Sequence, residues 1–532
     1  MHSGTISPAF LDNLLQQFLA DTPGAVVMED GLVLLDFRTA KFSITGESKC
    51  VLHIWSEERN MVRRVLDAKA SATALELQVL RFGQSQPTVL EIAASADRRT
   101  GAAKRAARAR YQVILQRSLQ REYPGFKLEH FSGSPDLEHS LSPVYARGLL
   151  RAGQSAFVVL GVSAEETQSN VDAALTFGIL WLEHQRQHLA GRAVVEGLKL
   201  FLPPGRSQIV LERAAHLNPE AAKWQLYELD ERLESAEAID LADTGNILSR
   251  LARAIDMRAA HERFAASIHR IRALVPTAEI TVESASEIVF RLHGLEFARA
   301  RLTPTPGSFR NRESISFGIG SAEYVLDEGS EPAFKELVQR MAEQRRAGAS
   351  PTNLFFRLAP ERWLESLTKA DVRSIDERLD PSWVYSQVPA FAATDRAMLD
   401  VLTCTLDGRL AVLELKADED IHLPLQGLDY WARVRWHQQH GEFTRNGYFA
   451  TGSAPGAAFA SAGMEGRELS SAPPLLYLVA PVLHLHPSTD ILLSYFSPRI
   501  EWTLVQLDEH WREGLRVVNR KHPYRRAVAS SR

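Results

Sequence analysis

The sequence predicts an α/β protein in which helices cover mixed β-sheets, arranged as two similar halves. Apolar runs of strand length alternate with segments of helical periodicity along the 532 residues. In the C-terminal third, a tight turn is followed by a run with the pattern of a buried strand. In addition, a stretch of the N-terminal half aligns with a stretch of the C-terminal half, which indicates an internal repeat.

The composition is that of a globular chain with several domains. Apolar residues make up 45% and charged residues 24% of a chain too long for one core. No apolar run reaches about eighteen residues, so no membrane span is expected, and residues 1–24 are expected to form an amphipathic helix instead of a secretion signal. Cys50 and Cys404 are the only cysteines, which fits a reducing compartment and excludes a four-cysteine zinc or iron–sulfur site. We therefore expect a cytoplasmic protein.

A hairpin in the C-terminal third carries two charged residues in an apolar strand. Residues 398–406 have the pattern of a strand, and the Asp-Gly dipeptide at 407–408 is typical of a two-residue turn. The return strand, 409–416, is apolar almost throughout, as expected for a strand buried on both faces. Glu414 and Lys416 are two positions apart, so they share one face. A buried strand rarely holds a carboxylate beside an ammonium group without a function for them.

These residue types have the chemistry of a metal-dependent phosphodiesterase. Asp400 and Glu414 can supply two oxygen ligands to Mg²⁺ or Mn²⁺. The metal would polarise the scissile phosphate and activate a water molecule, and Lys416 would orient that water or neutralise developing charge. Gln426 and Tyr430 lie four residues apart on a predicted helix, so both are expected to face the same site.

These five residues form the pattern D…E-x-K…Q-x-x-x-Y, which resembles the PD-(D/E)XK nuclease superfamily, in particular its RecB-like and NucS-like branches. The resemblance covers about residues 355–450. It implies a restriction-endonuclease-like α/β/α unit and a hydrolase that cuts DNA as an endo- or exodeoxyribonuclease with Mg²⁺ or Mn²⁺. RNA stays open as a substrate.

The resemblance also implies an acidic residue on the helix before the first strand. Glu365 is the candidate for this catalytic position, and Glu361 is the second candidate. RecB-like members usually have a glycine shortly before the aspartate, whereas an alanine, a methionine and a leucine precede Asp400 here. Asp395 is therefore a weaker rival for the role of metal ligand.

The N-terminal half contains a similar stretch. A shift of 253 aligns residues 155–186 with 408–439 without a gap and gives seven identities, against about two expected by chance. Residues 224–231 match 502–509 at five of eight positions with a shift of 278. The second copy is thus expected to hold an insertion of about 25 residues, which we place within 451–474.

The first copy lacks every proposed catalytic residue. At the shift of 253, the positions of Asp400, Glu414, Lys416, Gln426, Tyr430 and Glu365 are occupied by Arg147, Gly161, Ser163, Ala173, Phe177 and Gln112, respectively. Metal binding there is implausible without carboxylates. The first copy is therefore predicted to be an inactive pseudonuclease produced by tandem duplication.

The sequence accordingly predicts two restriction-endonuclease-like α/β/α units in tandem, each preceded by a small α+β accessory domain. The predicted domains are an accessory domain at 1–100, a degenerate nuclease-like domain at 101–245, a second accessory domain at 246–350 that repeats the first, and the PD-(D/E)XK nuclease domain at 351–532.

A basic stretch opens the predicted inactive unit. Residues 98–121 contain eight basic residues and no acid. The positions expected to contact nucleic-acid phosphates are Arg98, Arg99, Lys104, Arg105, Arg108 and Arg110. The alternative is a solvated helix face with no ligand.

Other functions and partners stay open beside the nuclease. The main alternative is a nucleic-acid-binding scaffold that uses the nuclease fold without cutting, and a third is a protein-interaction module with no affinity for nucleic acid. DNA is the expected partner, in repair or in defence against foreign DNA, together with a second copy of the chain or a repair or defence protein. His484 and His486 alternate on a predicted strand and are a weaker metal-site candidate.

Overall fold

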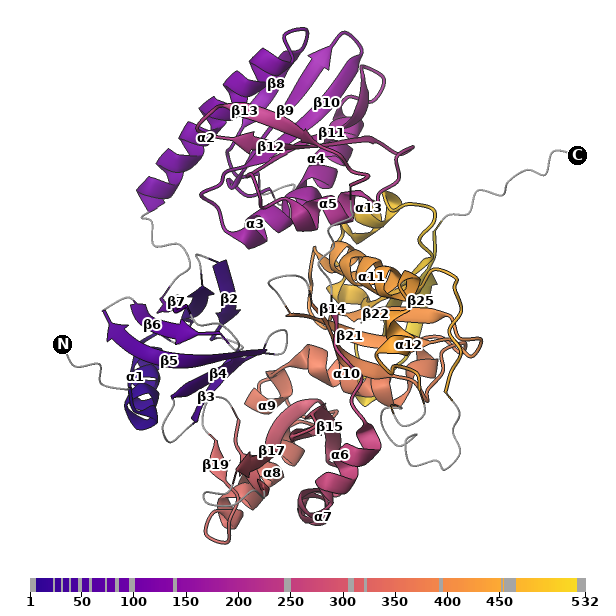
Figure 1. The fold of residues 1–532 in the computed structure, drawn as a ribbon. Helices are drawn as coiled ribbons and strands as arrows, with labels where there is room; N and C mark the ends of the chain where they lie inside the picture. The colour runs from indigo at the N-terminus through magenta and orange to yellow at the C-terminus, as the bar shows by residue number, and fades with distance from the viewer. Residues whose placement is uncertain are drawn as a thin grey trace, which may run out of the picture. The chain divides into compact units, whose positions relative to one another are not determined.

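The computed structural model describes residues 6–22, 24–29, 32–37, 40–45, 50–56, 60–71, 74–81, 86–94, 101–136, 141–243, 250–304, 311–319, 323–391, 396–450, 453 and 466–523. These residues form a mixed α/β protein with several sheets, which confirms the expected class (Figure 1). The chain divides into two compact units, residues 1–248 with 394–397 and 488–498, and the remainder. Within the described ranges, no helix is long and apolar enough to cross a membrane.

The first unit begins with a seven-stranded antiparallel sheet and helix α1 (Pro8–Asp21). Ser7 caps the helix by accepting a hydrogen bond from the amide of Phe10. Leu11 and Leu15 of α1 are fully buried against the apolar residues of the sheet. The strand order is β2-β1-β7-β6-β5-β4-β3. The strands are β1 (Val26–Glu29), β2 (Leu32–Asp36), β3 (Lys41–Thr45), β4 (Val51–Trp55), β5 (Asn60–Ala70), β6 (Ala74–Leu80) and β7 (Thr88–Ala93).

The same unit contains a six-stranded mixed sheet of order β13-β12-β11-β10-β9-β8. Helix α2 packs its Tyr111 and Leu115 on one face of this sheet, and α4 packs on the other, where Gly178 lies against Leu198. The elements are α2 (Gly101–Glu122), β8 (Lys127–Ser132), β9 (Tyr145–Ala152), β10 (Ser155–Val162), α3 (Gln168–Asp172), α4 (Ala174–His188), β11 (Val194–Leu202), α5 (Gln208–Ala214), β12 (Lys223–Asp230) and β13 (Ser235–Ile239). Helix α13 (Thr489–Ser494) is grouped with this unit.

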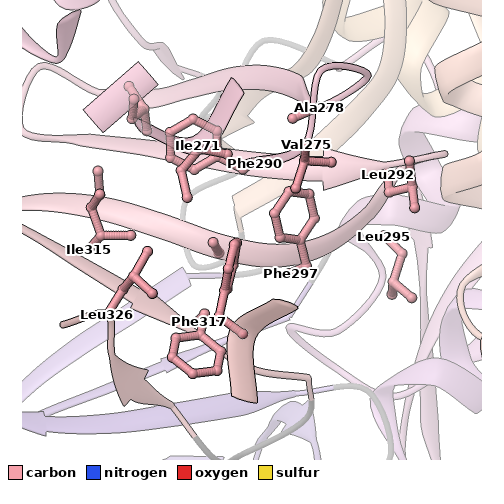
Figure 2. Close-up of a cluster of buried hydrophobic side chains, with 14 of the residues drawn as sticks. Ile271, Val275, Ala278, Phe290, Leu292, Leu295, Phe297, Ile315, Phe317 and Leu326 are labelled. Carbon is pink, nitrogen blue, oxygen red and sulfur yellow. The ribbon is translucent and has the colours of Figure 1, made fainter. Parts of the chain in front are cut away.

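The second unit begins with a five-stranded antiparallel sheet, β15-β16-β17-β18-β19, packed on helices. Figure 2 shows the apolar core of this region, in which Ile271 from α7 lies near Phe290 from β16. The elements are α6 (Met257–Arg263), α7 (Ala265–Leu274), β15 (Glu279–Ser284), β16 (Glu287–Leu292), β17 (Leu295–Pro304), β18 (Asn311–Phe317), β19 (Tyr324–Val325), α8 (Glu331–Gln344) and α9 (Leu354–Arg357).

The fourth sheet has the order β14-β20-β21-β22-β23-β24-β25. Helix α10 covers one face with the fully buried Trp363 and Leu364, and α11 packs on the other against β22 and β23. The elements are β14 (Arg250–Leu251), α10 (Pro360–Ala370), η1 (Val372–Ser374), β20 (Tyr385–Phe391), β21 (Arg396–Cys404), β22 (Leu410–Leu415), α11 (Leu423–Gln439), α12 (Glu442–Arg445), β23 (Leu475–Pro481), η3 (Val482–His484), β24 (Trp502–Leu507), η4 (Trp511–Glu513) and β25 (Val517–Lys521).

The hairpin β21–β22 differs in one detail from the sequence expectation. The amide of Thr405 donates to the carbonyl of Arg409 at 2.8 Å, and Gly408 has φ +83°. The loop therefore holds the three residues 406–408 and not two. A three-residue hairpin loop requires a left-handed residue at its last position, which glycine supplies without a steric cost.

The second and fourth sheets share their strand pattern. In each, an antiparallel hairpin is followed by two parallel strands and a final antiparallel strand. The registers align Trp224 with Leu198, Val158 and Leu149 in one sheet, and Trp502 with Leu476, Val412 and Leu402 in the other. The difference in residue number between equivalent positions is therefore 278 for β12 and β24 and for β11 and β23. It is 254 for β10 and β22 and 253 for β9 and β21.

The expected counterparts of Glu414 and Lys416 are therefore wrong by one residue. On this register they are Leu160 and Val162, not Gly161 and Ser163, because the β21–β22 loop holds one residue more than the turn after β9. A slip of one residue turns a side chain to the opposite face of a sheet. Consistent with this, Gly161 faces Tyr111 of α2, whereas Glu414 faces α11. Arg147 remains the counterpart of Asp400.

Candidate active site

Asp400 and Glu414 lie opposite each other on neighbouring antiparallel strands. The register Val401↔Leu413 places the two acids at the next paired position. Oδ2 of Asp400 accepts a hydrogen bond from the amide of Leu415 at 2.9 Å. Only 2% of Glu414 is exposed. The fold thus pairs the buried carboxyl group of Glu414 with that of Asp400, which is partly exposed.

Both carboxyl groups have raised pKa values. Burial raises the pKa of Asp400 to about 6, against the opposing effects of the Leu415 amide and the Lys416 ammonium group. Burial also raises the pKa of Glu414 well above its usual value, and the adjacent Asp400 adds to that shift. Two carboxylates so close cannot both ionise without a compensating positive charge. The ammonium group of Lys416 supplies part of that charge, and a bound metal cation would supply more.

The ammonium group of Lys416 lies among three carboxylates. Its Nζ atom is 3.6 Å from Glu414, 3.7 Å from Glu361 on α10 and 3.7 Å from Asp420 in the loop after β22. Although burial lowers the pKa of Lys416, the surrounding carboxylates raise it above its usual value. Lys416 is therefore a cation at neutral pH and is unsuited to act as a general base.

Two buried oxygen atoms at this site have no hydrogen-bond partner, Oε2 of Glu414 and Oε1 of Gln426 on α11. The first turns of α11 lie against the strand, since a Cβ on Gly427 would be 3.6 Å from the Cβ of Glu414. A buried oxygen without a donor is costly, and oxygen is the ligand that Mg²⁺ and Mn²⁺ prefer. The donor set at this position therefore fits a hard divalent cation.

Protein side chains alone would not complete such a site. In the described part of the chain, no group of three or more His, Cys, Asp or Glu side chains is arranged to hold a metal ion. Asp400 and Glu414 would thus supply two ligands, with main-chain carbonyl groups and water completing the shell. Mg²⁺ commonly binds through one or two carboxylates and retains several waters.

The two glutamates proposed on α10 have different surroundings. Glu365 is 6% exposed, and its carboxylate accepts a hydrogen bond from Arg362 at 2.7 Å. Burial raises the pKa of Glu365, but Arg362 and Lys369 lower it below its usual value overall. Glu361, the second candidate from the sequence, is instead the residue whose carboxylate lies beside Lys416.

Two further predicted residues are Tyr430 and Asp395. Tyr430 is half-buried on α11, four residues after Gln426. Asp395 lies outside the described residues. Asp420, which sequence reasoning missed, accepts a hydrogen bond from the amide of His422 just before α11 begins. Its position four residues after Lys416, in an acidic loop after the strand, was the available signal.

The basic residues proposed to bind phosphate lie on α2 where they are described. Arg108 is paired with Glu166 at 2.7 Å, and Arg110 with Glu165 at 3.0 Å. Arg105 is exposed and Lys104 is half-buried on the same helix. Arg98 and Arg99 lie outside the described residues. Part of the positive charge on α2 is thus matched by carboxylates of the chain itself.

His484 and His486 do not lie on a strand, so that expectation is wrong. Strand β23 ends at Pro481, and His484 closes the short helix η3 that follows. His484 lies 3.5 Å from Glu509, whereas His486 lies 3.8 Å from Glu419. The two histidines therefore approach different carboxylates and do not converge on one site.

Comparisons with known proteins do not assign the chain to a family. No protein-family model matches it, and no curated protein matches it. A solved structure similar to part of the chain is the crystal structure of a repair endonuclease from Pyrococcus abyssi, at 14% sequence identity and a TM-score of 0.15, over 39% of this chain and 92% of that chain. So low a TM-score does not show a common fold.

Proposed function

We propose that the chain is a metal-dependent nuclease that hydrolyses phosphodiester bonds of DNA, with its active site at the β21–β22 hairpin. The observation that carries this proposal is the cross-strand pair of Asp400 and the buried Glu414, with the ammonium group of Lys416 beside it. A carboxyl pair with raised pKa values is a typical feature of a functional site. The resemblance to PD-(D/E)XK nucleases includes the same three residues, together with Gln426 and Tyr430.

Each residue has a distinct part in the proposed reaction. Asp400 and Glu414 hold Mg²⁺ or Mn²⁺, which when bound supplies Lewis-acid activation of the phosphate and of a water molecule. Lys416 stays protonated and neutralises charge on the phosphate oxygens as the P–O bond breaks. Gln426 and Tyr430, near the start of α11, orient the substrate or the attacking water.

The acids around Lys416 keep it in place before substrate binds. Glu361 and Asp420 each lie 3.7 Å from its ammonium group. A phosphate group that approaches Lys416 would compete with these carboxylates for it. Glu365 is not a metal ligand in this proposal, because its carboxylate accepts a hydrogen bond from Arg362.

We propose that the six-stranded sheet of the first unit belongs to a degenerate copy produced by tandem duplication. The shared strand order supports this relation. The single-residue difference in hairpin length explains why the alignment of the two copies changes by one residue between the paired strands. The counterparts of the three central residues are Arg147, Leu160 and Val162, none of which is a metal ligand. The guanidinium group of Arg147 is buried, donates to the carbonyl of Ser134 at 2.7 Å and lies over the ring of Trp181. One active site per chain implies single-strand nicking or cutting of single strands, flaps or ends.

One experiment distinguishes the nuclease from the alternative, a scaffold that binds nucleic acid without cutting it. The full chain is incubated with labelled single-stranded, duplex and flap DNA and with RNA, in Mg²⁺, Mn²⁺ or EDTA, beside the variant Lys416→Ala. The control is Lys335→Ala, which removes an exposed lysine paired with Glu331 on α8. Cleavage that needs metal, is lost in Lys416→Ala and persists in Lys335→Ala supports the nuclease. Binding without cleavage supports the scaffold.

A further inference from the structure

The turn between β16 and β17 is built from two residues in the left-handed region. His293 has φ +46° and Gly294 has φ +74°. Leu292 and Leu295 pair on either side of the turn, and Figure 2 shows both among the buried apolar side chains of this region. Two consecutive positive φ angles define a type I′ turn, whose twist matches that of the strands. The turn is therefore a rigid end of the hairpin.

This turn touches the main chain of α10. A Cβ added to Gly294 would lie 2.0 Å from the carbonyl oxygen of Arg362 and 3.0 Å from the nitrogen of Trp363. These are backbone atoms of a helix, which cannot move aside as the end of a flexible side chain can. Only glycine leaves room for this approach. The turn of the five-stranded sheet and the helix of the fourth sheet are thus in direct backbone contact.

The same turn also contacts the indole of Trp363. Its ring is stacked on the ring of His293, with centroids 5.0 Å apart and an angle of 25° between the planes. The guanidinium group of Arg345 lies 4.9 Å from the centre of the indole. Trp363 itself is fully buried. These contacts restrict the orientation of the indole and hold α10 against the turn.

Arg345 joins the turn to the start of α10. It is fully buried and donates hydrogen bonds to the carbonyl oxygens of Leu292 at 3.1 Å and His293 at 2.7 Å. It also donates to the carbonyl oxygens of Leu358 at 2.5 Å and Ala359 at 3.1 Å, the two residues before α10. A buried charge needs such a set of partners. One side chain thus fixes the hairpin and the first turn of α10 to each other.

From these contacts we infer that Gly294, His293 and Arg345 are positioning residues of the proposed active site. Glu361 is the second residue of α10, and its carboxylate lies 3.7 Å from Nζ of Lys416. A displacement of α10 would therefore move Glu361 away from Lys416. The five-stranded sheet then has a role in catalysis through α10. The catalytic part of this inference rests on the proposed function.

The test compares two glycines with the same backbone conformation. Gly294→Ala and Gly348→Ala both place a side chain at a φ near +75°, but a Cβ on Gly348 would meet no atom within 4 Å. Because displacements of about 1 Å reduce turnover by about a hundredfold, we expect the kcat of DNA cleavage to fall at least about tenfold in Gly294→Ala. KM and the affinity for Mn²⁺ should change less than about twofold. Gly348→Ala should cleave as the unaltered chain does.

A second variant covers the case in which Gly294→Ala does not fold. His293→Asn keeps a residue that tolerates the left-handed region and removes the ring stacked on Trp363. We expect its kcat to fall about three- to tenfold, with KM unchanged. Unchanged kcat in His293→Asn, or in a folded Gly294→Ala, overturns the inference. A loss that appears equally in KM and in Mn²⁺ affinity also overturns it, because that indicates general damage to the fold.

A readout without catalysis separates this inference from the proposed function. Amide hydrogen exchange of the α10 peptides is compared between Gly294→Ala and Gly348→Ala. If the unaltered chain cuts no DNA, the proposed function fails. Hydrogen exchange alone then shows whether the hairpin positions α10. Faster exchange of α10 in Gly294→Ala than in Gly348→Ala supports positioning of α10 by the hairpin. Equal exchange in the two variants rejects it.

Discussion

Asp400 and Glu414 lie at paired positions on two antiparallel strands, and burial raises the pKa of both carboxyl groups. This pair costs stability when both groups ionise, since like charges in a buried position repel. It also offers two adjacent oxygen ligands to a cation. The same geometry thus accounts for an unfavourable local charge in the metal-free chain, which binding of the proposed metal would relieve.

Removal of one acid is predicted to stabilise the metal-free protein and to abolish its response to metal. Asp400→Asn should melt at a higher temperature than the unaltered chain in EDTA at pH 8, because one of the two repelling charges is gone. Mn²⁺ at about a hundred times its Kd should stabilise the unaltered chain by about 2.7 kcal/mol, and Asp400→Asn by much less. Calorimetry in EDTA and in Mn²⁺ measures both effects.

The control is Glu336→Gln, which removes an exposed carboxylate on α8. It should leave both the melting temperature and the metal response unchanged. An Asp400→Asn protein that is as responsive to Mn²⁺ as the unaltered chain would show that the cation binds elsewhere.

Lys199 on β11 is predicted to make the stability of the first unit depend on pH. Burial lowers its pKa from 10.5 to about 8, although Nζ lies 4.3 Å from the centre of the Tyr123 ring. The protonated form is thus disfavoured in the fold. The resulting penalty, about 3 kcal/mol, is complete below pH 8, shrinks between pH 8 and 10.5 and is absent above.

The variant Lys199→Met tests whether the destabilisation by Lys199 decreases as the pH rises. Its unfolding free energy relative to the unaltered chain should be most favourable near pH 6 and should fall as the pH rises to about 10. Chemical denaturation at several pH values provides the comparison. A difference between the two proteins that does not vary with pH contradicts a lowered pKa for Lys199.

The two arginine–glutamate pairs on α2 are predicted to differ in their effect on stability. Glu166 has 4% of its side chain exposed, whereas Glu165 has 42%. Arg108→Ala would leave a buried carboxylate without its partner and should cost about 1–3 kcal/mol. Arg110→Ala breaks an exposed pair and should cost less than about 1 kcal/mol. Calorimetry of the two variants measures the difference, and equal costs contradict the assigned burial.

The same helix is predicted to contact DNA phosphates. Charge reversal of Arg105, Arg108 and Arg110 together should weaken DNA binding and reduce its salt dependence, because fewer counterions are released on binding. Fluorescence anisotropy at several salt concentrations measures both quantities. Because Arg108 also stabilises the fold, Arg105→Glu alone is the cleaner variant and should show the smaller effect in the same direction. Unchanged affinity and slope in both variants reject this surface.

Local patterns were sufficient to predict much of the candidate site. Glu414 and Lys416 alternate within an apolar run, so their common face and their burial follow from strand geometry. The hairpin followed from an Asp-Gly dipeptide, but the loop length did not, because two- and three-residue loops both accept glycine at that point. That one residue then changed the alignment of Glu414 with the first half of the chain.

Long-range contacts account for the features that the sequence did not predict. Asp420 comes near Lys416 because the loop after β22 turns back into α11. Glu361 and not Glu365 lies beside Lys416, and the carboxylate of Glu365 is instead paired with Arg362. Arg345 has no sequence pattern that distinguishes it from an exposed arginine on a helix end, yet it is fully buried among carbonyl groups. Such partners are set by tertiary packing, which local propensity does not encode.

The measurement that tests the central claim most directly is the rate of DNA cleavage by Glu414→Gln in Mn²⁺. This variant keeps the shape of the side chain and removes the buried carboxylate that faces Asp400. We predict that the unaltered chain cleaves DNA in Mn²⁺ and not in EDTA, that Glu414→Gln lowers the rate at least about a hundredfold, and that Glu336→Gln cleaves normally. Cleavage by Glu414→Gln at the rate of the unaltered chain, or cleavage in EDTA, would contradict the account.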